Sequence, residues 1–240
     1  MSYNFKIFKN LDELSEYFSI YLSNQVDLSN DKFNLVLSGG STPKYIFQHL
    51  AAYFKEKIDW NKINIFWGDE RCVPPTDSES NFKMADENLL SKINIPEKNI
   101  FRIKGEENPD EEAERYSKVI EQNVLLKNSK PRFDLIMLGL GEDGHTASIF
   151  PDQHSLLEAE NICSVSVHPV TKQNRITLTG KVINNAKNIV FIATGKNKSK
   201  IVSEMLNNKD QRKKYPADFI KPEDGNMIWL LDESAASLLI

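Results

Sequence analysis

Short apolar runs alternate along the chain with stretches in which hydrophobic residues recur every three or four positions. The runs carry few polar residues, which is typical of strands buried on both faces of a parallel sheet. They predict strands at residues 5–8, 33–37, 63–67, 100–103, 133–138, 162–167, 175–179, 188–193 and 227–231. The periodic stretches predict helices at 11–22, 43–57, 81–92, 109–126 and 198–206. This alternation predicts an α/β fold with a mostly parallel sheet and helices on both faces.

Two of the predicted helices have clear start signals. Asn108 is a good N-cap, Pro109 suits the first helical position, and residues 110–112 are all acidic. In the second helix, Thr42 is the candidate cap and Pro43 the first helical residue. These signals fix the beginnings of both helices better than hydrophobic periodicity does.

Length and composition indicate one domain, residues 1–240. The chain has 40% hydrophobic and 27% charged residues, enough for a core of ordinary size. Its formal net charge of −4 offers no basic field, so we expect no nucleic-acid partner. Neither a signal peptide nor a run of about 18 apolar residues is present, so we expect no membrane span and a cytoplasmic location. Cys72 and Cys163 then read as reduced thiols.

The loop 38–43 follows a predicted strand directly. In parallel sheets, ligands bind at the carboxyl ends of the strands. The glycines let the backbone approach a ligand closely, and the free amides of Gly40, Ser41 and Thr42 at a helix start can bind an anion. The loop lacks the Gly-Lys-Ser/Thr ending of a nucleotide-binding loop. The alternative is a plain tight turn.

Three cations also follow or begin strands: Arg71 in Gly68-Asp69-Glu70-Arg71, Arg175 at the start of its strand, and Lys198 after the strand 188–193. A guanidinium binds phosphate through two parallel hydrogen bonds. Taken singly, each cation is most simply a solvated surface charge. Together with the Gly40–Thr42 amides, they would form a phosphate-binding site.

A third loop, residues 139–146, combines three glycines with Asp143 and His145. A neutral imidazole is the usual general base near neutral pH, and a nearby carboxylate fixes its tautomer. Asp143 and Asp69 are both candidates for that carboxylate. The histidines at 49, 154 and 168 are expected to be structural or surface residues. No cluster has metal-ligand spacing, so we expect neither a metal nor a cofactor.

These loops, in this order, resemble the 6-phosphogluconolactonase family. The most specific segments are residues 37–43, 67–71 and 139–151, the last reading Gly-Leu-Gly-Glu-Asp-Gly-His-Thr-Ala-Ser-Ile-Phe-Pro. The resemblance implies a Rossmann-like fold with a small appended subdomain. It also implies hydrolysis of 6-phosphogluconolactone in the oxidative pentose phosphate pathway, by a monomer or homodimer.

Glucosamine-6-phosphate deaminases belong to the same superfamily and are the main alternative. They carry Met-Asp-Glu-Tyr where this chain has residues 68–71, and Asn-Glu-Pro where it has Ile149-Phe150-Pro151. The chain therefore lacks the glutamate that tunes the histidine in those enzymes, which favours the lactonase. A non-catalytic sugar-phosphate-binding module is the second alternative, and the complete His145 loop argues against it.

Overall fold

The computed structural model describes residues 4–207 and 214–239. Six strands form one sheet in the order β1-β11-β10-β7-β2-β3, and every neighbouring pair is parallel. The α/β fold with a parallel central sheet is therefore confirmed. The strands are β1 Phe5–Phe8, β2 Phe33–Leu37, β3 Ile63–Trp67, β7 Leu135–Gly139, β10 Asn188–Ala193 and β11 Asn226–Asp232.

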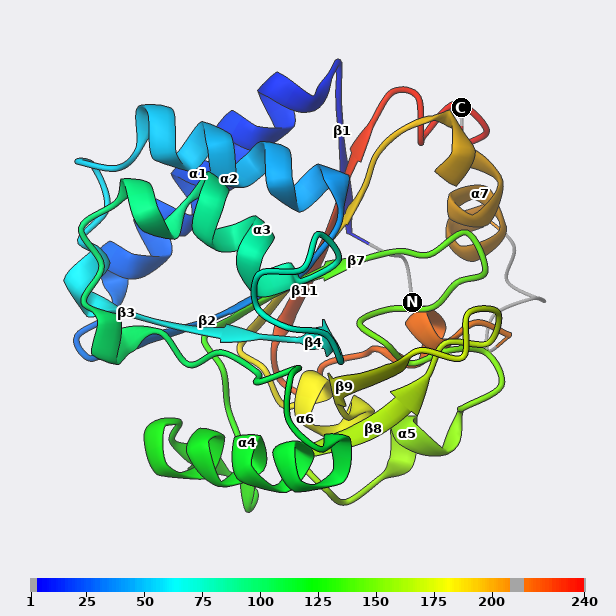
Figure 1. The fold of residues 1–240 in the computed structure, drawn as a ribbon. Coiled ribbons are helices and arrows are strands. Elements are labelled where there is room, and N and C mark those ends of the chain that lie inside the picture. The colour runs from blue at the N-terminus through cyan, green and yellow to red at the C-terminus, as the bar shows by residue number, and fades with distance from the viewer. Residues whose placement is uncertain (1–3, 208–213, 240) are drawn as a thin grey trace.

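Helices cover both faces of this sheet. Figure 1 shows α1, α2 and α3 together on one side of the central strands and α4 and α6 on the other. Their inward residues are apolar, as in α1, where Leu14, Phe18 and Leu22 are fully buried. The helices are α1 Leu11–Leu28, α2 Ser41–Tyr53, α3 Asn81–Asn88, α4 Pro109–Asn123, α5 Ser155–Glu158, α6 Gly180–Asn184 and α7 Ser199–Asn207.

A second, antiparallel sheet is added to the central one. It has the order β4-β9-β8 and consists of β4 Asp69–Arg71, β8 Cys163–Val167 and β9 Asn174–Leu178. The strand positions near 163 and 175 were predicted correctly, whereas β4 was read as a loop because its three residues are all charged. A short hairpin, β5 Leu126–Lys127 with β6 Lys130–Pro131, completes the strands.

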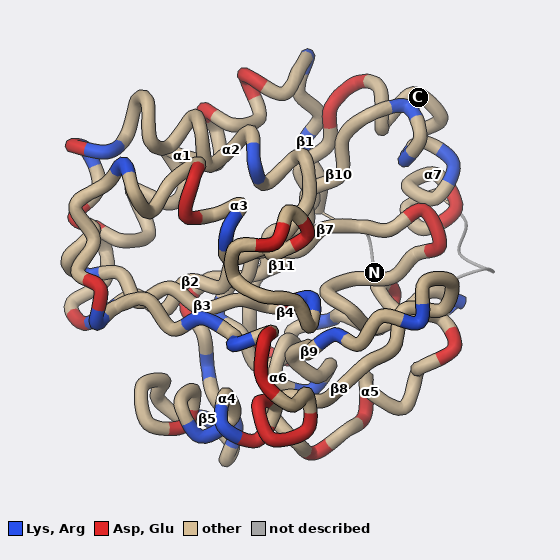
Figure 2. The backbone as a smooth tube through the Cα atoms, viewed as in Figure 1, with Lys and Arg blue, Asp and Glu red and all other residues tan. Residues whose placement is uncertain are grey.

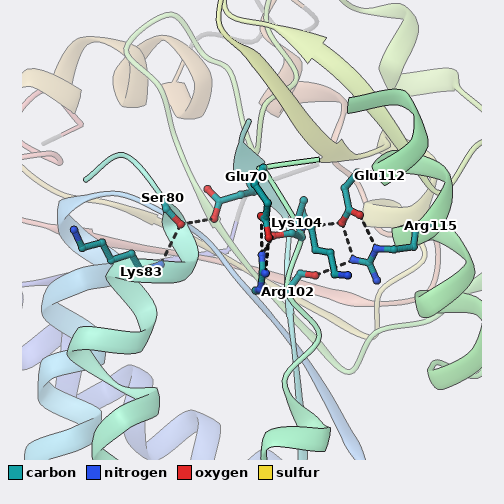
Figure 3. A network of polar contacts seen from close by, with 9 residues as sticks. Glu70, Ser80, Lys83, Arg102, Lys104, Glu112 and Arg115 are labelled. Carbon is teal, nitrogen blue, oxygen red and sulfur yellow. Dashed lines mark hydrogen bonds and ion pairs between the residues drawn. The ribbon is translucent and has the colours of Figure 1, made fainter. Parts of the chain in front are cut away.

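The strand predicted at residues 100–103 is wrong. Only Ile100 bridges to Ile65, and the following residues have no regular structure. Polar contacts to α4 hold this segment instead (Figure 3): the Lys104 amide donates to Glu112 (2.7 Å), and Arg115 Nη2 donates to the Arg102 carbonyl (3.1 Å). Pairing with β3 stops after the Phe101 amide, which donates to the Ile65 carbonyl (2.8 Å), and the Arg102 carbonyl is bonded to α4 instead.

Charged residues of both signs are spread along the chain, and its two cysteines are unpaired. Figure 2 shows Lys and Arg interspersed with Asp and Glu along the chain. Cys72 and Cys163 are both free thiols, as expected. In the part of the chain that the structure describes, no helix is long and apolar enough to cross a membrane.

The predicted N-cap of α4 is confirmed and gives a stability prediction. The Asn108 side chain accepts hydrogen bonds from the amides of Asp110 (3.1 Å) and Glu111 (3.3 Å). Asn108→Ala should lower the free energy of unfolding by about 1 kcal/mol, because it leaves these amides without their acceptor. Chemical denaturation measures this change. Asn123→Ala, at the other end of α4, is the control and should have a clearly smaller effect; equal losses would refute the capping role.

Candidate active site

A polar cleft of about 200 Å³ lies at the carboxyl ends of β2 and β7. Segments far apart in the sequence line it, as the sheet topology requires. Its lining residues are Ser38, Gly39, Gly40, Asp69, Arg71, Asn81, Gly139, Leu140, Gly141, His145, Ala147, Arg175 and Lys198. The cleft thus brings together most of the predicted site residues. Sequence reasoning missed Asn81 and Ala147, because neither stands in a pattern that carries a chemical signal.

The loop after β7 presents His145 through its glycines. The Gly141 amide donates to the His145 carbonyl (2.8 Å), which folds the loop back on itself. A Cβ atom on Gly141 would lie 2.1 Å from His145 Nδ1, so only glycine leaves room for the imidazole. Gly144 has a φ of +80°, which glycine adopts without strain. The geometry therefore requires glycine at 141 and 144, whereas a Cβ on Gly139 would meet only Ser38 Oγ at 3.8 Å, an ordinary contact distance.

Asp143, and not Asp69, contacts the imidazole. Asp143 Oδ1 lies 2.6 Å from His145 Nδ1 and also accepts the His145 amide (3.1 Å). In the neutral imidazole this contact places the proton on Nδ1 and leaves Nε2 free to accept one. Burial raises the pKa of Asp143, but the hydrogen bond and the charge of His145 outweigh burial and lower it overall.

Asp69 is held by a different partner. Ser148 Oγ donates to Asp69 Oδ2 (2.6 Å), and both residues are buried. Neighbouring Glu70 is a structural residue: it accepts from Ser80 Oγ (3.0 Å; Figure 3) and from the amides of Asn81 and Phe82 at the start of α3. Burial raises the pKa of Glu70, although these amides oppose the shift.

Two guanidinium groups form one wall of the cleft. Arg71 on β4 pairs directly with Arg175 on β9, so their side chains leave the small sheet on the same face. The Nε atoms of both are buried without a hydrogen-bond partner, and neither guanidinium forms an ion pair with a described carboxylate. Burial, then the charge of Arg71, lowers the pKa of Arg175. Asp69, Glu79 and Glu70 oppose this shift from beyond ion-pair distance. Two adjacent cations that form no ion pair favour a bound anion.

Arg71 ends β4 and Arg175 lies near the start of β9, so the two do come from separate strand ends, but no sequence pattern indicated that these ends are paired. They are cross-strand neighbours in the antiparallel sheet. Lys198, at the end of the short helical turn Lys196–Lys198, reaches the cleft from beyond β10. Burial lowers the pKa of Lys198, while Glu142 and Asp143 oppose that shift.

The first loop contributes through its glycines. Gly39 and Gly40 line the cleft, whereas Ser41 and Thr42 do not. The expected cap is also wrong: Gly40 is the N-cap of α2, Ser41 is its first residue, and no side chain caps it. The Thr42 hydroxyl instead lies 2.6 Å from the hydroxyl of Thr194. This hydrogen bond joins the start of α2 to the residue that follows β10. Any role of Ser41 and Thr42 would come from their amides at the helix start.

Phe150 packs against both His145 and the cationic wall, the side of the cleft formed by Arg71 and Arg175. This buried ring lies 4.8 Å from the His145 ring, and the Arg175 guanidinium lies 5.9 Å from its centroid. His168 packs against the same ring at 5.1 Å. We expected His168 to be a structural or surface residue; it lies on the β8–β9 connection, one residue beyond a strand of the small sheet. Position 168 carries no sequence signal of this proximity.

Known proteins share both the sequence and the fold. Residues 11–229 match the model of the glucosamine-6-phosphate isomerase/6-phosphogluconolactonase family. The chain belongs to this family. A 6-phosphogluconolactonase of Haemophilus influenzae is 40% identical over 230 residues, which cover 95% of each chain. The solved structure of a devB protein is 38% identical, with a TM-score of 0.95 and coverage of 99% of both chains.

The fold is common to both activities of the family. The solved structure of a monomeric glucosamine-6-phosphate deaminase superposes on this chain with a TM-score of 0.83 at 19% identity, covering 98% of this chain and 99% of that one. At this identity the likeness concerns the fold alone. The choice between the activities must therefore come from side chains in the cleft.

The contact between Asp143 and His145 predicts a measurable titration. The carboxyl group of Asp143 should titrate below its ordinary value of 3.8, and His145→Ala should raise the midpoint because the hydrogen-bond donor is lost. Carbon-13 NMR of the side-chain carboxyl measures both. Glu106, whose pKa is lowered by its hydrogen bond from Arg102, is the internal control and should not respond. An unchanged Asp143 midpoint in the variant would mean that the two side chains do not interact.

Proposed function

We propose that this chain is a 6-phosphogluconolactonase, which hydrolyses 6-phospho-D-glucono-1,5-lactone to 6-phosphogluconate in the oxidative pentose phosphate pathway. Its relatives of that name support the substrate. The observation that carries the proposal is the cleft itself. It is lined by His145, which Asp143 contacts, and by two guanidinium groups that form no ion pair with a described carboxylate.

In the proposed mechanism, the cationic wall binds the phosphate. Arg71 and Arg175 supply forked donors, and Lys198 and the Gly40–Thr42 amides supply further positive charge. The lactone carbonyl then lies near His145. Nε2 of His145 takes a proton from water as the water attacks this carbonyl, and Asp143 stabilises the imidazolium that forms. His145 returns the proton to the ring oxygen as the ester bond breaks.

One local feature favours the lactonase over the deaminase. The side chain that packs against His145 is the apolar ring of Phe150, in the segment where the deaminases carry Asn-Glu-Pro. An apolar ring cannot exchange a proton with the histidine. The hydrolysis of a lactone needs only a base that returns its proton to the leaving oxygen, and the His145–Asp143 pair supplies one.

The direct test compares two substrates. Freshly generated 6-phosphogluconolactone should release acid faster with the protein than without it, in a pH-stat or with an indicator dye. Glucosamine 6-phosphate should release no ammonia above the blank. Ammonia release without acid release would reverse the assignment. The absence of both would support a binding module. Lactonase activity should be unchanged by a chelator, because no metal is expected. Light scattering measures the molar mass and distinguishes a monomer from a homodimer.

His145 is expected to dominate the chemical step. His145→Ala should lower kcat by about 10²–10⁴-fold, the usual contribution of a positioned general base. KM should change little, because the phosphate contacts lie elsewhere. His49→Ala is the matched control: this histidine packs against Tyr53 and Phe54 near α1, and its loss should leave kcat unchanged. Near-normal turnover in a folded His145→Ala protein would rule out this mechanism.

The cationic wall is expected to control the affinity for phosphate. Arg175→Ala or Arg71→Ala should raise KM about ten- to hundredfold, because hydrogen bonds to charged groups contribute about 1.5–3 kcal/mol. Lys198→Ala should have a smaller effect. Inhibition by inorganic phosphate should weaken in parallel. Arg132→Ala serves as control, because this arginine also has a buried Nε but pairs with Asp224 outside the cleft. Wild-type KM and phosphate inhibition in the Arg175 and Arg71 variants would eliminate the proposed phosphate site.

A further inference from the structure

Asp69 is a buried carboxylate whose presence in the cleft the proposed mechanism does not explain. Its residue is 5% exposed, it lines the cleft, and it forms no ion pair with any described Lys, Arg or His. The Asp69 charge opposes the lowering of the Arg175 pKa, but a carboxylate buried without an ion pair still depends on hydrogen bonds to offset its burial. Asp143 already holds the imidazole, so Asp69 is not needed to orient His145.

One oxygen of this carboxylate is fixed from within the fold. Oδ2 accepts the Ser148 hydroxyl at 2.6 Å, and Ser148 is fully buried. The Ser148 amide in turn donates to Thr177 Oγ1 (3.2 Å), and Thr177 is the strand partner of Asp69. Ala147, just before Ser148, has a left-handed φ of 47°. That turn directs the segment after His145 back toward β4.

The other oxygen, Oδ1, receives no donor from the described residues. Asp69 and Arg71 stand two residues apart on β4, so their side chains lie on the same face, about 7 Å apart. Ser148 connects Asp69 to the His145 loop on the other side. Asp69 therefore lies between the proposed phosphate contacts and the proposed base, where the carbon chain of a bound sugar phosphate would pass.

We propose that Asp69 Oδ1 accepts hydrogen bonds from hydroxyl groups of the substrate, with Ser148 as the positioning residue that keeps the carboxylate turned toward the cleft. This inference rests on the proposed function. An ionised carboxylate only accepts hydrogen bonds, and hydroxyl groups on a sugar lactone are donors. A buried acceptor discriminates strongly against a substrate that lacks the matching hydroxyl, because the acceptor is then left unpaired.

The test uses lactones that each lack one hydroxyl. The probes are 6-phosphogluconolactone and three 6-phospho-δ-lactones without the hydroxyl at C2, C3 or C4. Wild type should lose about tenfold or more in kcat/KM on at least one of the three. In Asp69→Asn, the Ser148 hydroxyl can keep the amide oxygen and turn the NH₂ group toward the cleft, which replaces an acceptor by a donor. This variant should hydrolyse that deoxy lactone and the parent at similar kcat/KM.

Ser148→Ala tests the positioning role. It should reduce the same discrimination in part. Inhibition by inorganic phosphate should not weaken in either variant, because Arg71 and Arg175 are intact and Asp69→Asn removes a negative charge near them. Ser166→Ala is the matched control: this serine is in the same small sheet, is equally buried, and its hydroxyl has no hydrogen-bond partner in the described structure. Its kinetics should be those of wild type.

Three results would overturn the inference: wild type that does not distinguish the deoxy lactones, Asp69→Asn with undiminished discrimination, or a loss of phosphate inhibition equal to the loss of discrimination. Unaltered discrimination in Ser148→Ala would remove the positioning role. If wild type hydrolyses no lactone, the proposed function fails, and calorimetry then tests the site directly. Asp69→Asn should bind 6-phosphogluconate about tenfold more weakly but inorganic phosphate at least as tightly; unchanged binding of both would refute the hydroxyl contact.

Discussion

The antiparallel pairing of β4 with β9 is the constraint on which the cleft depends. It joins residues 69–71 to residues 174–178 and places the two guanidinium groups side by side on one face. Neither forms an ion pair with a carboxylate among the described residues. A bound anion would therefore relieve their repulsion further than the nearby carboxylates of Asp69, Glu79 and Glu70 do. The same register sets Asp69 opposite Thr177, to which the His145 loop is bonded through Ser148. One strand pairing thus relates all three proposed functional groups.

The contact between His145 and Asp143 depends on local geometry within the loop that carries them. An imidazole and its carboxylate partner lie only two residues apart, and bringing Asp143 Oδ1 to 2.6 Å from Nδ1 requires a tight turn. Gly141 leaves room for the ring, and Gly144 takes the left-handed backbone that the turn needs. His145 and Asp143 are therefore brought together within one loop, and β7, which precedes the loop, places it at the cleft.

The family has one fold and two activities, so the fold does not tell which reaction this chain catalyses. A deaminase with 19% identity has the same fold, so the sheet and the helices carry no information about the reaction. Two segments of the sequence differ from the deaminases, residues 68–71 and 149–151, and in the second of them Phe150 packs an apolar ring against His145. That ring also lies 5.9 Å from the Arg175 guanidinium, so a single apolar side chain packs against both the proposed base and the cationic wall.

The sequence alone determined the α/β fold, the six central strands, the cap of α4 and the His145 loop. All of these are local: burial on both faces makes a continuous apolar run, and caps and tight turns depend on a few adjacent residues. The tertiary structure alone decided that Arg71 and Arg175 are neighbours, that Asp143 and not Asp69 holds His145, and that residues 100–103 form no strand. The Asp143 contact depends on how side chains are directed within one loop and on where the distant Asp69 is held. The other two depend on pairing between segments far apart in the chain. Such a register is set by the packing of the whole fold, and no pattern within either segment records it.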